Sequence, residues 1–340
     1  MATAVDGQVG PGQPVPPEEG ASPPPASFPT AGARIGWRAW ATSPLALLPL
    51  ALVLVVGGVL LVESGGTWFG WSFFGFSYFF DPTGGPSTFG VSLFLVDSAI
   101  VALPALAIAS GLSLAMAAAI VVYLPAGIGR ALTVLTNLLA GIPSVVYGIW
   151  GYVVLAPYFG STVQPTLKGF LGWIPFLGGP LSPGGVGSLL AIAILTLMIV
   201  PIATAVMRES LRAVPHEMIE AGLALGATPW EVLSRVRIPA ARRGLWGATF
   251  LGLGRALGES VAVAMVIGAS VWIPPNLYQP STTLASFVFF QLDSAFYYPT
   301  LLRALIEFSL VLLALATAVN LLGHRASGSD PTVLVSRGGG

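Results

Sequence analysis

Residues 187–207 read GSLLAIAILTLMIVPIATAVM, a run of 21 residues without a charged side chain. A helix needs roughly 20 predominantly apolar residues to cross the hydrocarbon core of a bilayer. Similar stretches stand at 44–62, 91–123, 131–157, 244–270 and 301–322. The sequence therefore predicts an all-α, polytopic integral membrane bundle with six transmembrane helices.

The composition agrees with this class and excludes several functions. Of the 340 residues 55% are hydrophobic and only 8% are charged, against about 25% charged in an average soluble domain. The net charge of zero gives no reason to expect a nucleic-acid partner. The chain has no cysteine, and His216 and His324 are far apart, so neither a metal site nor a cysteine nucleophile is indicated.

Lys168 is the only lysine of the chain, and it stands in the sequence Thr-Leu-Lys-Gly-Phe. A P-loop requires a lysine directly after a glycine-rich loop. This chain therefore cannot bind ATP in that way, and we expect no cofactor in it and no enzymatic activity of its own. If ATP drives the protein, Mg-ATP must be bound by a partner subunit.

Arginines predict the orientation of the bundle. With a cytoplasmic N-terminus, the outer segments hold only Lys168, whereas eleven arginines fall on the inner side. These are Arg34, Arg38, Arg130, Arg208, Arg212, Arg235, Arg237, Arg242, Arg243, Arg325 and Arg337. Because positive charge collects in cytoplasmic segments, we expect a multi-pass protein of the cell (cytoplasmic) membrane with both termini inside.

The chain divides by composition into four parts. Residues 1–40 are rich in proline and predict a disordered cytoplasmic tail, and residues 326–340 predict a second one. Residues 41–90 hold the first helix and an outer loop, and residues 91–325 form the core. The outer loop is crowded with aromatic residues: Trp68, Phe69, Trp71, Phe73, Phe74, Tyr78, Phe79 and Phe80. A lipid-facing belt or, alternatively, a surface for an external partner would explain them.

The cytoplasmic loop at 208–243 carries the most specific local signals. Pro215 suits the first turn of a helix and Gly226 suits the end of one. Thr228-Pro229-Trp230-Glu231 is a capping box that starts a second helix. We expect two short helices bent at Gly226 into an elbow. An ordinary connector is the alternative, although loops this long are often functional.

The same loop resembles the EAA loop of bacterial ABC importer permeases. Its residues Glu220-Ala221-Gly222, Gly226 and Val236-Arg237-Ile238-Pro239 follow that spacing, with Gly222 where the family usually has alanine. The resemblance implies an importer permease fold whose coupling helix fits into a cleft of an ATP-binding subunit. Glu220, Ala221, Gly222, Gly226 and Pro239 are the implied coupling residues.

Two further segments resemble the phosphate-specific branch of that family. They are Ala140-Gly141-Ile142-Pro143-Ser144-Val145-Val146-Tyr147-Gly148 and Leu253-Gly254-Arg255-Ala256-Leu257-Gly258-Glu259. The continuation at 261–268 looks like the PstC type, and the resemblance covers roughly residues 45–325. It implies a second permease subunit (PstA type), two ATP-binding subunits (PstB type) and an extracytoplasmic phosphate-binding protein (PstS type). Permeases for sulfate, molybdate or phosphonate share the loop pattern and remain alternatives.

Residues within the apolar stretches suggest where the substrate passes. Pro143, with Gly141, should kink the third helix, and the freed carbonyl favours a place inside the bundle. Arg255 stands roughly 15 Å deep at 1.5 Å per residue, where an arginine costs on the order of 3 kcal/mol. Glu259 follows on the same face of a continuous helix and can pair with it.

Arg303 and Glu307 repeat this spacing in the last stretch, nearer the outer side. A planar guanidinium suits phosphate oxygens, so we hypothesise a translocation path with two Arg–Glu pairs. A neutralised brace between helices is the alternative for each pair. An ion-coupled secondary transporter could instead use Glu259 and Glu307, but that class does not need the elbow.

Overall fold

The computed structural model describes residues 44–64, 73–83 and 87–327. Both predicted tails lie outside these ranges, apart from Ala326 and Ser327, and so do Trp68, Phe69 and Trp71 of the outer loop. The chain forms two units that meet between Leu54 and Val55. All sites described below belong to the second unit.

Four helices confirm the expected spans to within a few residues. They are α2 (Pro44–Glu63), α3 (Val91–Ala118), α8 (Ser188–Arg212) and α14 (Pro299–Ser327). A π-helical turn, η1 (Ala119–Tyr123), continues α3. By length and composition α3, α8 and α14 can each cross a membrane. Their runs of leucine, isoleucine and alanine form long apolar helices. A bilayer core requires such helices, because backbone N–H and C=O groups there must form their hydrogen bonds within the segment.

The third stretch is a broken helix and not a single kinked one. α4 (Ala126–Ala140) ends at Gly141, and α5 (Ser144–Trp150) starts after Pro143. The helical axis turns by 92° between them. Pro143 cannot continue a helix because it lacks a backbone N–H, and it disfavours helical geometry at the residue before it. The expected limits of 131–157 are therefore wrong, and the kink expected at Pro143 is a break between two separate helices.

The fifth stretch is also broken. α11 (Ile238–Gly258) is followed by α12 (Val261–Ile267), and the axis turns by 64° between them. Glu259 has an extended backbone with ψ 112°, so the expected continuous helix over 244–270 is wrong. With each bent pair counted as one span, the described residues hold up to five candidate spans.

The remaining elements are short. After α5 come η2 (Gly151–Leu155), α6 (Ala156–Tyr158), η3 (Phe159–Val163), α7 (Gln164–Leu171) and η4 (Pro175–Leu177). The loop after α8 contains α9 (His216–Ala224), α10 (Pro229–Val232) and η5 (Leu233–Arg237), and α13 (Leu284–Ala295) precedes α14. Strands β1 (Tyr78–Phe79) and β2 (Thr88–Phe89) pair antiparallel, with Tyr78 opposite Phe89.

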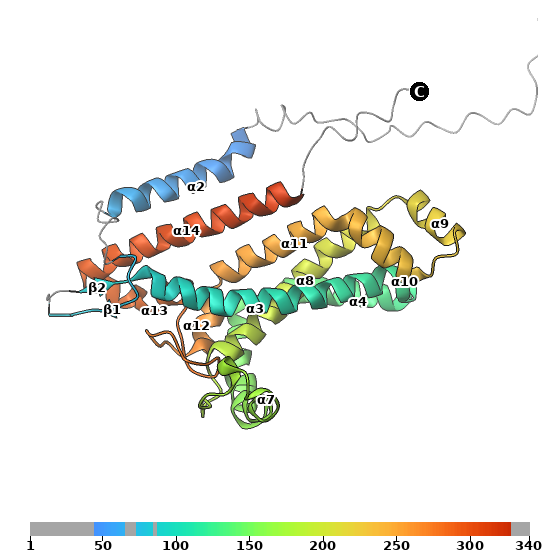
Figure 1. The fold of residues 1–340 in the computed structure, drawn as a ribbon. Coiled ribbons are helices and arrows are strands. Elements are labelled where there is room, and N and C mark those ends of the chain that lie inside the picture. The colour runs from blue at the N-terminus through green and yellow to red at the C-terminus, as the bar shows by residue number, and fades with distance from the viewer. Residues whose placement is uncertain (1–43, 65–72, 84–86, 328–340) are drawn as a thin grey trace, which may run out of the picture. The chain divides into compact units, whose positions relative to one another are not determined.

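The main core lies where α3, α8, α11 and α12 meet. Its buried residues include Ala105, Ile194, Leu195, Ile199 and Val266. α8 packs against both α3 and α11, and α11 also runs along α14 (Figure 1). Small residues on α3 let these helices approach closely, as is usual in membrane bundles.

A second core is built largely of aromatic rings. Phe73 and Tyr78 of the outer loop pack with Phe94, Phe287 and Phe308 from α3, α13 and α14. Centroid distances of 4.2–5.9 Å are typical of favourable aromatic pairs. The proposed lipid belt is therefore wrong for Phe73 and Tyr78, which stabilise the end of the bundle where this aromatic core lies.

Candidate translocation path and coupling elbow

The elbow between α8 and α11 has the predicted turn and the predicted cap. Gly226 adopts φ +84°, a left-handed conformation that glycine reaches without steric cost. The Thr228 Oγ1 atom accepts the Glu231 N–H at 3.3 Å, and the Thr228 N–H donates to Glu231 Oε2 at 2.9 Å. The capping box is therefore confirmed. The hydrogen bond that the Thr228 N–H donates to the Glu231 carboxylate helps to hold the pKa of this carboxyl below its usual range.

The second helix of the elbow is longer than expected. From Pro229 the chain is helical without a break to Gly258, through α10, η5 and α11. The Ile238 N–H donates to the Leu233 carbonyl, a π-type bond, directly before Pro239. Prolines and π-type turns are the usual causes of helix kinks, and the helical run bends between α10 and α11 (Figure 1). The elbow is thus one short helix joined to the extended end of α11.

Buried side chains fix the elbow to the bundle. Ile219 of α9 and Val232 and Leu233 of the second helix pack with Met207 and Leu211 at the end of α8. A Cβ atom on Gly222 would lie 3.2 Å from Val232 Cγ2. Gly222 therefore lets α9 lie close to α10, and an alanine there would require a small shift of Val232.

The solvent-exposed face of the elbow is partly apolar. Of the predicted coupling residues, Glu220, Ala221, Gly226 and Pro239 are exposed and Gly222 is half-buried. Four large apolar side chains stand beside them in a polar loop: Met218, Leu223, Leu225 and Trp230. Leu225 is 90% exposed. An exposed apolar patch with a polar rim is typical of an interaction site.

The fold brings together the two segments with the Gly141–Pro143 bend and Arg255. A Cβ atom on Gly148 of α5 would lie 3.0 Å from Ala262 Cα and 2.6 Å from Met265 Sδ of α12. Glycine at this position therefore allows α5 to contact α12 directly. The Tyr147 hydroxyl donates to the Leu139 carbonyl across the bend, at 2.9 Å.

Arg255 lies in the last turn of α11, near this bend. Its positive charge interacts electrostatically with the Tyr147 hydroxyl. The Arg255 Nε atom is buried and has no hydrogen-bond partner among the described residues. A guanidinium with a free buried donor can take an anion, because unmade hydrogen bonds of buried donors are costly.

Glu259 does not share a helix face with Arg255. The Glu259 Oε1 atom accepts the Ala262 N–H at 3.2 Å, at the start of α12. No salt bridge joins Arg255 to Glu259 within the described ranges. The expected i,i+4 geometry is wrong because α11 ends at Gly258, and the two residues flank the 64° break instead.

Arg303 and Glu307 stand one turn apart on α14, as expected. Arg303 is exposed, whereas Glu307 is only 6% exposed. Glu307 directly precedes Phe308 of the aromatic core. Their role in a path stays a prediction.

Asp97 is a buried acidic residue that the sequence reasoning did not consider. It lies in α3 with 1% exposure, and its Oδ2 atom accepts the Thr282 N–H at 3.4 Å. Its Oδ1 atom has no hydrogen-bond partner among the described residues. An acidic residue inside an apolar stretch is by itself a functional signal, and that rule would have identified Asp97.

The architecture is that of a polytopic helical membrane protein with an exposed, partly apolar elbow at one end. The family model described as "Binding-protein-dependent transport system inner membrane component" matches residues 107–325. The chain belongs to this family. It is therefore a membrane component of a transport system that depends on a binding protein.

Two relatives and one solved structure extend the comparison. The phosphate transport system permease protein PstC of Mesorhizobium japonicum is 37% identical over 70% of this chain and 74% of its own length. The PstC protein of Haemophilus influenzae is 35% identical over 82% and 89%. A chain from a crystal structure of a bacterial alginate ABC transporter is 14% identical, covers 86% and 94%, and has a TM-score of 0.54, which supports the fold alone.

Proposed function

We propose that this chain is the permease subunit of an ATP-driven importer of inorganic phosphate. The observation that carries the proposal is the 35–37% identity to two PstC proteins over 70–82% of the chain. The packed segments around Gly148 and Arg255 supply a basic side chain with a free buried donor. A guanidinium fork matches the oxygens of a phosphate.

The complex would contain four further subunits. A PstA-type permease completes the path, two PstB-type subunits bind Mg-ATP, and a PstS-type protein delivers phosphate from outside. The exposed apolar face of the elbow, with Leu225 and Trp230, is the surface for an ATP-binding subunit. This requires the elbow to be cytoplasmic, in agreement with the arginines and with both termini inside.

A continuous helix links the elbow to Arg255. The helical run from Pro229 to Gly258 has no break, and its α11 part alone, 21 residues long, spans about 32 Å at 1.5 Å per residue. Motion of the ATP-binding subunits would move one end of this helix and so displace Arg255 at the other. Phosphate would exchange water for the Arg255 guanidinium, and Glu259 would limit how tightly the anion is held.

Uptake by the reconstituted complex tests the proposal. Vesicles that contain both permeases and the ATP-binding subunits, with the binding protein outside, should take up labelled phosphate only when ATP is inside. Excess sulfate should not compete. Competition by sulfate would assign another oxyanion, and uptake that survives without ATP but follows an ion gradient would favour a secondary transporter.

A further inference from the structure

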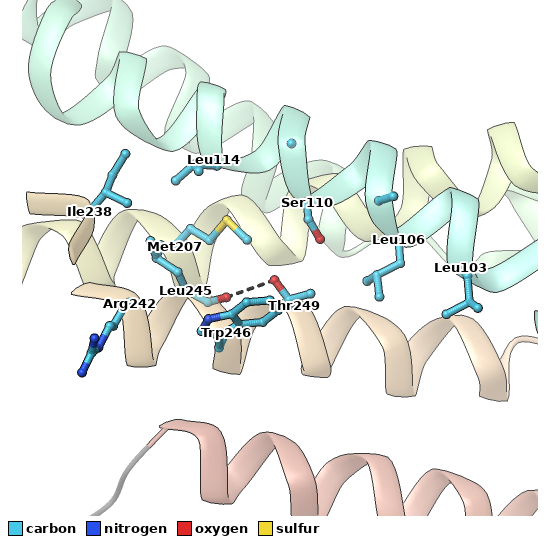
Figure 2. A pocket seen from close by; sticks show the side chains of 12 residues that line it. Leu103, Leu106, Ser110, Leu114, Met207, Ile238, Arg242, Leu245, Trp246 and Thr249 are labelled. Atoms are coloured by element: carbon cyan, nitrogen blue, oxygen red, sulfur yellow. Dashed lines mark hydrogen bonds between the residues drawn. The ribbon is translucent and has the colours of Figure 1, made fainter. Parts of the chain in front are cut away.

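A groove runs along the side of the bundle between α3 and α11. Its inner part has a volume of about 490 Å³ and an almost wholly apolar lining, with Leu106 and Leu114 of α3, Met207 of α8 and Trp246 of α11 (Figure 2). The Thr249 hydroxyl donates to the Leu245 carbonyl at 3.1 Å and is thus satisfied within its own helix. The groove therefore suits a flexible apolar occupant.

The groove continues toward the other end of α11. A second cavity of about 300 Å³ lies among α3, α11 and α14, and Leu103 lines both cavities. From Arg242 at the first end to Leu253 in the second, α11 advances about 16 Å. This is close to half of the roughly 30 Å hydrocarbon core, or the depth of one leaflet.

The groove faces away from the proposed path. Trp246 precedes Arg255 by nine residues on the unbroken helix α11, which is about two and a half turns. The two side chains therefore project from opposite faces of α11. The face that carries Trp246 is the side of the bundle on which lipid is expected.

The inner end of the groove carries the features of a membrane boundary. Arg242 lines this end and is exposed, and Trp246, one turn further in, is 59% exposed. Amphipathic tryptophan rings favour the headgroup region, and arginine there attracts anionic lipid. An apolar channel of one leaflet's depth thus ends at a positive charge.

We propose that this groove binds one acyl chain of an anionic phospholipid, with the lipid phosphate held by Arg242. The charge at its end distinguishes this occupant from an uncharged lipid. The alternative occupant is a helix of the second permease subunit, and the test below distinguishes it from a lipid. The proposal does not depend on which solute the complex carries.

The chain offers matched variants for this test. Gly111 lines the groove, and a Cβ atom there meets nothing within 4 Å, so Gly111→Phe can place its ring in the groove. Gly127 of α4 is equally free and supplies the control Gly127→Phe. Arg242→Gln removes the charge, and Arg243→Gln removes an exposed neighbouring charge that does not line the cavity.

The experiment uses the intact complex in nanodiscs with phosphatidylglycerol or phosphatidylcholine that carries a photoreactive group in the acyl chain. Phosphatidylglycerol should label the α3 peptide that contains Leu103 to Leu114. Arg242→Gln should weaken labelling about fivefold, the effect of one arginine near an anionic surface. Gly111→Phe should remove it, whereas both control variants should label like the wild type.

Three outcomes would overturn the proposal. Equal labelling by phosphatidylcholine would show that the headgroup is not recognised. Labelling that persists in Gly111→Phe would place the lipid elsewhere. A photoreactive residue in place of Leu103 that crosslinks to the second permease subunit would make the groove a subunit interface.

Discussion

Arg255 is the residue on which the proposed path depends most. The fold places its guanidinium beside the α4–α5 bend, close enough to interact with Tyr147, and leaves its Nε donor without a partner among the described residues. Its partner in the sequence hypothesis, Glu259, is engaged at the start of α12. Arg255 therefore has no ion pair among the described residues, and its contact with an anion is the prediction to test.

Replacing Arg255 with alanine should lower phosphate uptake by about tenfold or more, because a hydrogen bond to a charged group contributes about 1.5–3 kcal/mol. The uptake rate of Arg255→Lys should lie between those of the wild type and Arg255→Ala, since lysine keeps the charge but lacks the planar fork. Initial uptake rates in proteoliposomes measure this effect. Arg243→Ala on the same helix is the control, and normal uptake by Arg255→Ala would refute the role.

Asp97 makes a second prediction at this scale. Asp97→Asn keeps an oxygen for the Thr282 N–H and should leave thermal stability nearly unchanged or raise it. Asp97→Leu leaves that N–H without its acceptor and should cost about 1–3 kcal/mol. Thermal unfolding of the purified complex compares the two, and equal melting of the leucine variant and the wild type would contradict this account.

At the scale of single elements, the sequence predicted what depends on neighbouring residues. The elbow could be predicted because Gly226 and the Thr228–Glu231 capping box determine the backbone of residues only a few positions away. The break at Glu259 was not predicted, because it lies within a long apolar stretch, although Gly258 directly before it is typical of a helix end. α13 was missed because its 12 residues are too few for a membrane-spanning helix.

Thr228→Ala should destabilise the start of α10 by about 1 kcal/mol, the usual value of an N-cap. Hydrogen exchange of the amides of residues 230–232 and of those that follow should quicken in the complex. Ser234→Ala is the matched control, because the Ser234 hydroxyl donates to carbonyls of its own helix, those of Trp230 and Glu231. Unchanged exchange in Thr228→Ala would show that packing alone holds the elbow.

At the scale of the whole molecule, the six apolar stretches predicted the class correctly but not the course of the chain. Three helices run uninterrupted, and two stretches are bent by 92° and 64°. Hydropathy reports only that a segment prefers an apolar surrounding, so it cannot distinguish a straight helix from a bent one. In the proposed mechanism the elbow acts on Arg255 through α11, which connects the two.

The exposed face of the elbow predicts how the subunits hold together. Leu225→Asp should weaken binding of the ATP-binding subunit by about tenfold or more, as for a central interface residue. It should leave the melting temperature of the permease unchanged, because Leu225 is 90% exposed. Co-purification and ATPase activity measure binding. Trp173→Asp, at an 80% exposed apolar position elsewhere, should bind normally, and normal binding by Leu225→Asp would refute the assignment.

The unbroken helix from Pro229 to Gly258 also sets an angular phase between its two ends. One residue inserted into α11 would rotate everything beyond it by about 100° and shift it by about 1.5 Å. Arg255 would then leave the bend while the elbow kept its own fold. The number of residues between the elbow and Arg255 therefore matters as much as which residues they are.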